Sequence, residues 1–341
     1  MFSLTLQKRK VLKKILVIRF SSIGDIILTT PVIRALKTQI NCELHILTKE
    51  KYSMLFASSP YVDQMHAFRD KLDEIIPVLR MENFDFVADL HKNLRSFQVK
   101  RALKVPSASF SKANRQKWLL VNLKINRLPK VHIVDRYFQA VQSLGVKNDG
   151  KGLDYFIPEK GFIDLNEYPL LKKKPFVAFA IGGRHYTKLF PVQKVVAVID
   201  RLKQPVVLLG GNEDRETAEQ IKELCSHDGI MNACGQLNLH QSASLLRQSA
   251  LVITNDTGLM HIAAAFEKPV ISIWGNTIPE FGMYPYEPDD EQKVVIAQVK
   301  DLKCRPCSKI GLKKCPKGHF KCMMNQDEDF IVREANRLLS L

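Results

Sequence analysis

Asp25 lies in the stretch "VIRFSSIGDIILTTPVI" (17–33), where an apolar strand leads through a short polar loop into a helical segment. A carboxylate at the start of a helix is favoured by the helix dipole and by the free N–H groups of the first turn, so Asp25 could be only a cap. Ligands of open α/β sheets, however, bind at the carboxyl ends of strands. There, a carboxylate could accept a proton from a substrate as a general base. The stretch alone leaves both interpretations open.

A second stretch, "VITNDTGLMHIAAAFEKPVISIWGNT" (252–277), brings several polar groups to the end of one strand. Asp256 ends the strand, Thr257 and Gly258 form a turn, and His261 follows in the first turn of the next helix. A helix N-terminus preceded by glycine suits a phosphate, because its N–H groups are free and a ligand can approach the backbone closely. The alternative is that Asp256 and Thr257 only cap this helix while His261 packs beneath it.

A third stretch, "AIGGRHYTKLFP" (180–191), ends a strand in two glycines and continues with Arg184, His185, Thr187 and Lys188. Cations beside a glycine loop can offset the charge of a diphosphate. The alternative is a solvated loop that carries these charges by chance. The chain lacks the G-x-x-x-x-G-K-[ST] spacing and has no G-x-G-x-x-G after its first strand. These absences argue against a Walker-type ATPase and a nicotinamide dehydrogenase.

Four cysteines cluster near the C-terminus in "CRPCSKIGLKKCPKGHFKC" (304–322), with His319 among them. This number of ligands suits a structural zinc site, since four thiolates leave no open position for a substrate. Six residues separate the second pair, which is wider than the usual two to four, so reduced thiols or disulfides remain the alternative. The cluster consists of Cys304, Cys307, Cys315 and Cys322.

The elements that carry these residues alternate between strand and helix. Apolar strands are expected at 14–20, 42–48, 84–91, 175–183, 205–211, 250–256 and 269–275, with amphipathic helices between them and one continuous helix over 26–40. This alternation predicts an α/β protein with parallel sheets. The segment 157–175 is rich in Pro, Lys and Gly and is expected to link two Rossmann-like domains that face each other across a cleft. A terminal amphipathic helix over 327–341 should pack on one domain.

The formal net charge of +16 is concentrated in the first half of the chain. Residues 1–150 carry 26 Lys/Arg against 12 Asp/Glu, whereas residues 151–341 carry 25 against 23. A positive electrostatic potential of this kind attracts an anionic partner, which could be nucleic acid, anionic lipid or a phosphorylated substrate. No zinc-finger, RNA-recognition or basic-zipper pattern favours nucleic acid. No apolar run reaches the roughly 18 residues of a membrane span and no signal peptide is evident, so a cytoplasmic protein is expected.

In order and spacing, these motifs resemble the ADP-heptose:lipopolysaccharide heptosyltransferases, glycosyltransferase family nine with the GT-B fold. The similar stretches are "ILVIRFSSIGDIILTTPVIRALK", "DFVADLHKNLRS", the Gly-Gly…Thr-Lys…Pro loop and "NDTGLMHIAAA…KPVISIWG". The resemblance runs from about residue 14 to the terminal helix. Its most specific element is the combination of Gly24-Asp25 with Asp256-Thr257-Gly258-x-x-His261.

The resemblance implies an inverting transfer of heptose from ADP-heptose to the lipopolysaccharide inner core at the cytoplasmic face of the membrane. It implies an acceptor-binding domain over 1–160 and a nucleotide-sugar-binding domain over 175–326, and no cofactor for catalysis. The basic first half suits an anionic glycolipid acceptor and a peripheral membrane location. The alternatives are a glycosyltransferase that uses another nucleotide diphosphate sugar, and a non-catalytic glycolipid- or nucleic-acid-binding protein with this fold.

The resemblance also implies roles for the residues above. Asp25 matches the base, and Lys188, assisted by Thr187, matches the diphosphate-facing position. Thr257, Gly258 and His261 would complete the donor cradle, and Asp256 would accept hydrogen bonds from sugar hydroxyls. The expected donor-binding residues are Thr187, Asp256, Thr257, Gly258 and His261, with Lys188 and Asp25 catalytic.

Two further groups of residues have less specific surroundings. Glu213 and Asp214 follow a strand that ends in "LLGG" and could hold a ribose diol, although exposed helix starts are often acidic. Ser22, Gly24 and Arg95 are expected on the acceptor side, where Arg95 would meet phosphate or carboxylate unless it is an ordinary surface arginine. The tract 111–130, which mixes cations with Trp118 and leucines, fits a membrane-lying helix and an ordinary amphipathic helix equally well.

Overall fold

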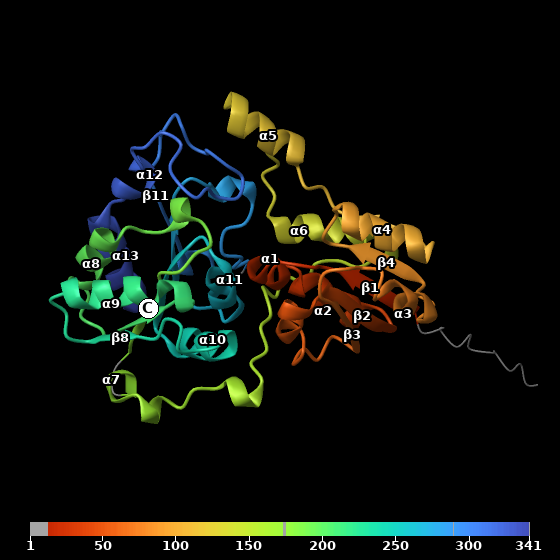
Figure 1. Cartoon of the computed structure of the whole chain (residues 1–341), viewed down its shortest axis with the longest axis horizontal. Coiled ribbons are helices and arrows are strands. Elements are labelled where there is room, and N and C mark those ends of the chain that lie inside the picture. Colours follow the sequence, from red (N-terminus) through yellow and green to blue (C-terminus); the bar gives the residue numbers. More distant parts are fainter. Residues whose placement is uncertain (1–12, 173–174, 289, 341) are drawn as a thin grey trace, which may run out of the picture. The chain divides into compact units, whose positions relative to one another are not determined.

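The computed structural model describes residues 13–172, 175–288 and 290–340 (Figure 1). By their contacts these residues form two compact units. Unit 1 consists of residues 13–22, 29–111 and 134–149. Unit 2 consists of residues 23–28, 112–133 and the described residues from 150 to 340. The segments 112–133 and 150–160, expected in the first domain, therefore group with unit 2.

Unit 1 is built on a five-stranded sheet in the order β3-β2-β1-β4-β5, and every pairing in it is parallel. The central strand β1 is fully buried over Ile15–Ile18, as expected for a strand covered on both faces. Helices cover the sheet, and the polar loops follow the strand ends. The strands are β1 (Lys13–Ile18), β2 (Cys42–Lys49), β3 (Gln64–Phe68), β4 (Phe86–Asp89) and β5 (Ser107–Ser109), and the helices are α2 (Thr30–Gln39), α3 (Ile76–Met81), α4 (Leu94–Leu103) and α6 (Ile133–Tyr137).

The prediction of one continuous helix over 26–40 is wrong. The segment forms α1 (Ile23–Ile27), a turn at Leu28 and Thr29, and then α2. Pro31 lies in the first turn of α2, where a residue without an N–H costs nothing and the fixed φ of proline favours the helix start. The break separates α1 from α2, and by its contacts α1 belongs to unit 2.

Unit 2 is built on a six-stranded parallel sheet in the order β11-β10-β9-β6-β7-β8. The adjacent strands β9 and β6 are buried along their whole length, which brings the loops that follow them to the same edge of the sheet. The strands are β6 (Val177–Ala180), β7 (Val206–Leu209), β8 (Ile230–Asn232), β9 (Leu251–Asn255), β10 (Val270–Trp274) and β11 (Val294–Gln298), and the helices are α1 (Ile23–Ile27), α5 (Asn114–Leu123), α7 (Pro169–Lys172), α8 (Val192–Ile199), α9 (Arg215–Leu224), α10 (Leu239–Gln248), α11 (Gly258–Ala265), α12 (Lys321–Met324) and α13 (Glu328–Leu339).

The segment expected as a linker is packed onto unit 2 over its described part. The N–H of Ile163 donates to Ser244 Oγ at 2.9 Å, and Gln248 Nε2 donates to the carbonyl of Ile163 at 3.0 Å. A Cβ on Gly161 would lie 2.6 Å from His240 Cβ, so a larger residue would push the segment away from α10. Residues 173 and 174 of the expected linker lie outside the described residues.

The terminal helix α13 packs against α8 and against strands β9, β10 and β11. It buries Ile331, Val332, Ala335 and Leu338 in the unit 2 core. Asp327 caps its N-terminus by accepting a hydrogen bond from the N–H of Phe330 at 2.9 Å. Among the described residues, no helix has both the length and the apolar character needed to cross a bilayer.

Candidate active site

Lys188 and Asp256 form an ion pair in unit 2 between the loops that follow β6 and β9. Lys188 Nζ lies 2.6 Å from Asp256 Oδ2, and the two side chains are 16% and 12% exposed. The hydroxyl of Thr277, which follows β10, donates to the same carboxylate oxygen at 2.7 Å. The loops after three neighbouring strands are thus joined at one carboxylate.

Asn255 fixes these loops to each other from within the core. Its Nδ2 donates to the carbonyl of Ile181 at 2.8 Å, and its Oδ1 accepts from the N–H of Phe190 at 3.2 Å. Asn255 is fully buried, so these bonds form where unpaired polar groups would be costly. They hold the glycine loop and its lysine in a defined position before any ligand is present.

Thr187 is buried directly before Lys188 and is held by the cysteine-rich segment. Its N–H and its hydroxyl lie 3.2 Å from the carbonyl of Leu312, and the hydroxyl accepts from the N–H of Leu312 at 2.8 Å. Its own carbonyl accepts from the N–H of Asn276 at 3.3 Å. The hydroxyl is therefore engaged with the protein, which favours a positioning role for Thr187.

The turn at Thr257 and Gly258 starts α11, but side chains do not cap this helix. Thr257 is the N-cap residue and accepts no capping hydrogen bond through its side chain, and Asp256 is engaged with Lys188 and Thr277. The capping expected by the alternative interpretation is therefore not formed by Thr257, whereas His261 is buried as that interpretation expected. The hydroxyl of Thr257 lies 3.5 Å from that of Thr254.

Gly24 and His261 bring α1 into close contact with α11. A Cβ on Gly24 would lie 2.6 Å from His261 Cδ2 and 3.4 Å from the Cα of Gly258. On the facing helix, a Cβ on Gly258 would lie 2.9 Å from Ile23 Cγ2. The two glycines permit an approach that larger residues would prevent, and this approach sets the position of Asp25 on α1.

His261 is buried and is surrounded by the three charged residues of the site. The pKa of His261 is lowered to about 4, chiefly by burial. The carboxylates of Asp256 and Asp25 act in the opposite direction, and Lys188 lowers the pKa slightly. The imidazole is therefore neutral at neutral pH. Its Nδ1 is a buried atom without a hydrogen-bond partner among the described residues. Asp256 and Lys188 are paired at 2.6 Å, and Asp25 follows Gly24, whose backbone packs against the ring of His261.

Asp214 and Glu213 follow β7 and differ in exposure. Asp214 is buried against Gly182 and Gly210, and its Oδ2 accepts from the N–H of Gly211 at 2.8 Å. Burial raises the pKa of Asp214 above its ordinary value, and Glu213 adds to the effect. Glu213 itself is exposed. Of the two carboxylates, Asp214 contacts the glycine loop of the site.

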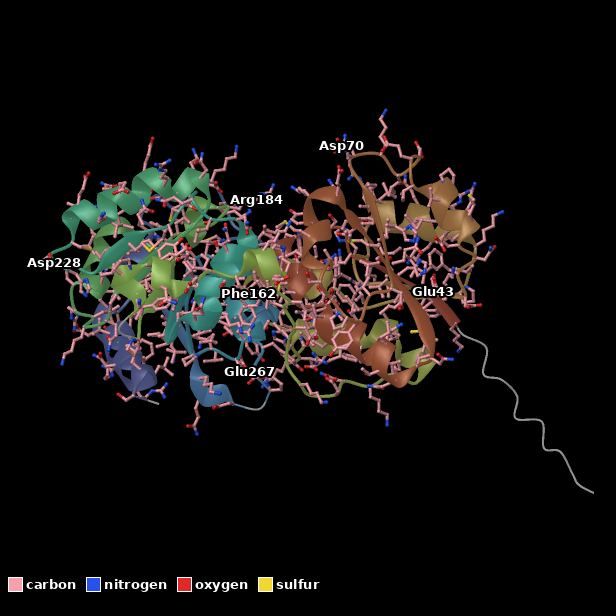
Figure 2. All side chains as sticks on the ribbon, turned by 90° about the horizontal axis from the view of Figure 1, so that it is seen from below. Glu43, Asp70, Phe162, Arg184, Asp228 and Glu267 are labelled. Carbon is pink, nitrogen blue, oxygen red and sulfur yellow. The ribbon has the colours of Figure 1, made fainter. Side chains whose placement is uncertain are left out.

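Ser22 and Arg95 lie in unit 1, and Arg184 lies at the surface of unit 2 (Figure 2). Arg95 is exposed in the first turn of α4, just after β4, so its guanidinium is accessible to an anion. Ser22 is exposed at the end of the loop before α1. Tyr186 stacks on Phe320 with ring centroids 4.9 Å apart, which places a ring of the loop after β6 (181–191, expected to bind the donor and called the donor loop below) against the cysteine-rich segment.

The four clustered cysteines are free thiols, and no three of their sulfur atoms lie within 4.8 Å of one another. Burial, with a smaller contribution from the neighbouring cysteines of the cluster, raises the pKa of both Cys307 and Cys322 to about 11. His319 Nε2 lies 3.9 Å from Cys304 Sγ. Thiols with raised pKa values are protonated at neutral pH unless a metal ion displaces the protons, so the group has the donor set of a thiolate metal site.

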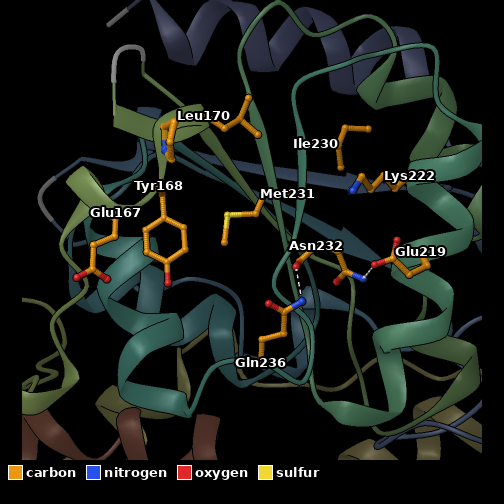
Figure 3. Close-up of a pocket in the computed structure, with 10 residues that line it drawn as sticks. Glu167, Tyr168, Leu170, Glu219, Lys222, Ile230, Met231, Asn232 and Gln236 are labelled. Carbon is orange, nitrogen blue, oxygen red and sulfur yellow. Dashed lines mark hydrogen bonds between the residues drawn. The ribbon is translucent and has the colours of Figure 1, made fainter.

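A surface pocket of unit 2 lies beside the edge strand β8 (Figure 3). It is lined by residues of α7, α9 and β8 together with Glu167, Tyr168 and Gln236, and it contains none of the residues predicted for the site. Within it, Asn232 Nδ2 donates to Glu219 Oε1 at 2.8 Å. The pocket therefore has no part in the arrangement around His261.

Thr277 was missed by the sequence analysis. It follows β10 in "WGNT", and its position after a strand of the same sheet was the available signal. Leu312 was missed as well, because its backbone contact with Thr187 joins residues 125 apart in the chain.

Comparison with known proteins gives the family. The sequence model described as glycosyltransferase family 9 (heptosyltransferase) matches residues 74–314, which is more than two thirds of the chain. The chain belongs to glycosyltransferase family 9. The expected enzyme class, a glycosyltransferase, is confirmed by this match.

The family 9 chain is similar over nearly its whole length to curated and solved relatives. Lipooligosaccharide heptosyltransferase 2 of Haemophilus influenzae is 23% identical, over 96% of this chain and 99% of the relative. The solved glycosyl transferase family 9 protein of Veillonella parvula has a TM-score of 0.76 at 23% identity, covering 96% and 97% of the two chains. The E. coli ADP-heptose lps heptosyltransferase II has a TM-score of 0.69 at 20% identity, covering 96% and 98%. These structures confirm the expected fold with two parallel sheets.

Proposed function

We propose that this glycosyltransferase moves heptose from ADP-heptose to the inner core of lipopolysaccharide, with inversion at the anomeric carbon. The observation that carries the proposal is that α1, which bears Asp25, packs through Gly24 against His261 of α11, while Asp256, directly before α11, is paired with Lys188. An inverting transfer needs a base for the acceptor hydroxyl and positive or N–H groups for the leaving diphosphate. This arrangement supplies both within one site.

In the proposed reaction, Asp25 takes the proton of the acceptor hydroxyl as its oxygen attacks the anomeric carbon. The bond from that carbon to the diphosphate oxygen breaks, and ADP leaves with its electron pair. Lys188 and the N–H groups at the start of α11 stabilise the charge that develops on the diphosphate. All groups in this transfer come from the protein and the two substrates.

Neutral His261 has a supporting role in this proposal. A charged imidazole beside Asp25 would form an ion pair with the base and reduce its capacity to take a proton. Burial keeps the ring neutral, and its contact with Gly24 sets the distance between α1 and α11. His261 is therefore proposed as a positioning residue.

The donor-binding groups are proposed to engage different parts of ADP-heptose. Asp256 and Thr277 would face the sugar hydroxyls once the diphosphate competes for Lys188, and Thr257 and Gly258 would contact the diphosphate. Asp214, which touches the glycine loop, is preferred over exposed Glu213 for the ribose. Adenine and heptose are supported by the similarity to heptosyltransferases, such as the ADP-heptose lps heptosyltransferase II of E. coli.

The acceptor side is proposed to include Ser22, Gly24 and Arg95 and to work at the cytoplasmic face of the membrane. On α4, Leu94 and Phe97 are 74% and 55% exposed, and Arg95 and Arg101 are exposed beside them. Apolar side chains next to cations suit an anionic lipid surface. The full-length protein should sediment with anionic vesicles and not with neutral ones, and the Leu94→Ser/Phe97→Ser double variant should bind the anionic vesicles less.

The cysteine cluster is proposed to hold one structural metal ion. Tetrahedral thiolate sites bind zinc or iron, and four ligands leave no position for a substrate. Such an ion would fix the segment that holds Thr187 through Leu312. The proposed role is thus to order the donor loop.

A nucleotide panel tests the proposed donor. Thermal unfolding should shift upward with ADP and ADP-heptose, by an amount that grows with the logarithm of ligand concentration over its dissociation constant. A clear preference for UDP or GDP would overturn the heptose assignment and leave glycosyl transfer intact. A lack of response to every nucleotide diphosphate would favour a non-catalytic binding protein.

A further inference from the structure

Two buried histidines lie side by side in the sheet of unit 1, outside the proposed transfer chemistry. His45 on β2 is fully buried, and His66 on β3 is 4% exposed. His45 Nδ1 and His66 Nε2 are 2.9 Å apart, and both rings pack edge-on against Phe84. Burying two imidazoles in an apolar layer is costly unless their nitrogens are bound.

Glu82, which follows α3, adds a carboxylate to this pair. Glu82 Oε1 lies 3.8 Å from His66 Nε2, and one donor atom from each of the three residues lies within 4.8 Å of the others. Nitrogen and oxygen ligands about 2 Å from a tetrahedral zinc ion are separated by roughly 3.3 Å, so shifts of a few tenths of an ångström would bring the atoms to coordination distance. The geometry points to a divalent transition-metal site formed by His45, His66 and Glu82, with water completing the shell.

The groups around these ligands are those that orient metal ligands in proteins. Glu43 Oε1 lies 2.8 Å from His45 Nε2, which places the hydrogen on Nε2 and leaves the Nδ1 lone pair for a metal. Lys14 Nζ donates to Glu82 Oε2 at 2.9 Å, and Gln64 Nε2 donates to Oε1 at 3.0 Å. Each oxygen has two lone pairs, so Oε1 keeps one for the ion.

The charges of the cluster also favour a divalent cation. Glu43 and Glu82 contribute two negative charges against the single positive charge of Lys14, which lies 3.5 Å from Glu43 and 2.9 Å from Glu82.

An ion can reach the site from solvent. The side chains of Glu82 and Glu43 are 17% and 33% exposed, and Glu43 is labelled in Figure 2. On binding, the hydrogen that His66 Nε2 shares with His45 would move to the other ring nitrogen of His66, with no net change of charge on the ring. The ion would join β2, β3 and the turn after α3, which are separated in the sequence.

Cobalt binding to the full-length protein tests this site. The cysteine cluster is a second candidate, but thiolate ligands give intense charge-transfer bands, whereas a nitrogen and oxygen site gives only weak visible d–d bands. Because the cysteine cluster is expected to hold its ion in the protein as purified, we expect one further equivalent of Co²⁺ with the weak bands alone. Zinc should displace it and raise the temperature of thermal unfolding.

Matched variants identify the ligands. His66→Gln and Glu82→Gln should each lower the affinity for Co²⁺ at this site, followed by its weak d–d bands, at least tenfold. Glu43→Gln should lower this affinity by about 10- to 100-fold, because Glu43 orients the ring of His45. His227→Gln in unit 2 and Glu74→Gln on the surface of unit 1 should bind as the wild type does.

Either of two results would overturn the proposal. One is that the wild type shows no weak d–d bands of Co²⁺ bound by nitrogen and oxygen ligands. The other is that Glu82→Gln binds Co²⁺ with the same affinity as the wild type. If His66→Gln fails to fold, Glu82→Gln decides alone, since its amide can still pair with Lys14 at a partly exposed position.

Discussion

Lys188 Nζ lies 2.6 Å from Asp256 Oδ2, so the cation proposed for the diphosphate is paired with a carboxylate when no donor is bound. The pair is largely buried, and Thr277 donates to the same carboxylate oxygen. A diphosphate that reaches Lys188 must therefore compete with Asp256. In the proposed reaction, this competition would free the carboxylate for sugar hydroxyls only when the donor is in place.

Substitutions of this pair should have opposite effects on ADP binding. Lys188→Ala should weaken ADP binding by about tenfold or more, and turnover with it, because a charge-assisted bond to the diphosphate is lost. Asp256→Asn should bind ADP at least as tightly as the wild type, because the competing charge is gone, yet transfer more slowly. Calorimetry with ADP and steady-state rates measure the two effects. Unchanged ADP affinity in folded Lys188→Ala would exclude this loop from the diphosphate site.

Asp25→Asn should keep ADP affinity and lose transfer by roughly two orders of magnitude or more, as expected when a general base is removed. The amide is nearly isosteric, so α1 should keep its packing against α11. Asp70→Asn, at an exposed position of unit 1, is the matched control and should transfer normally. Turnover near that of the wild type in Asp25→Asn would remove this carboxylate from the mechanism.

Gly24→Ala should reduce both stability and turnover, because its Cβ would lie 2.6 Å from the buried His261 ring. The double variant Gly24→Ala/His261→Ala removes the clash and should be more stable than the sum of the single changes predicts. Urea unfolding of the four proteins measures this coupling. Strict additivity would mean that the two residues do not press on each other.

The sequence predicted the buried strands better than the exposed ones. β1, β6 and β9 are continuous apolar runs and were found, whereas β3, β5, β8 and β11 are short or partly exposed and were missed. Local pattern carries little information for a strand that depends on its neighbour for burial.

The same distinction applies to the site. Asp256 and Lys188 could be placed at strand ends from the sequence, but their 2.6 Å pairing depends on β6 lying beside β9. The role of Gly24 was not predictable, because its contact with His261 joins segments far apart in the chain. Such contacts come from tertiary packing and leave no local signal.

Protonation of His261 should make stability depend on pH. Its pKa of about 4 lies below the ordinary value of 6.5, so between these values the unfolded chain binds more protons than the folded one. The neutral ring contributes roughly 3 kcal/mol to the free energy of unfolding above pH 6.5, and this contribution is lost as the pH falls to about 4. The difference in unfolding free energy between the wild type and His261→Gln should therefore grow with pH across this window. A pH-independent difference would contradict a neutral, buried ring.

The cysteine cluster should couple metal content to donor binding. The N–H of Cys307 donates to the carbonyl of Asn276 at 3.2 Å, and the N–H of Asn276 donates to the carbonyl of Thr187 at 3.3 Å. On the other side of the same loop, Leu312 holds the Thr187 hydroxyl. A metal ion in the cluster would therefore stabilise the donor loop from two points.

Elemental analysis of protein purified without added metal should give about one thiolate-bound ion per chain. Cys307→Ser should lose that ion and bind ADP several-fold more weakly, because the loop before Lys188 loses its support. Cys42→Ser, a buried cysteine of unit 1, is the control and should keep both metal and ADP affinity. Full ADP affinity in metal-free Cys307→Ser would show that the donor loop is ordered without the cluster.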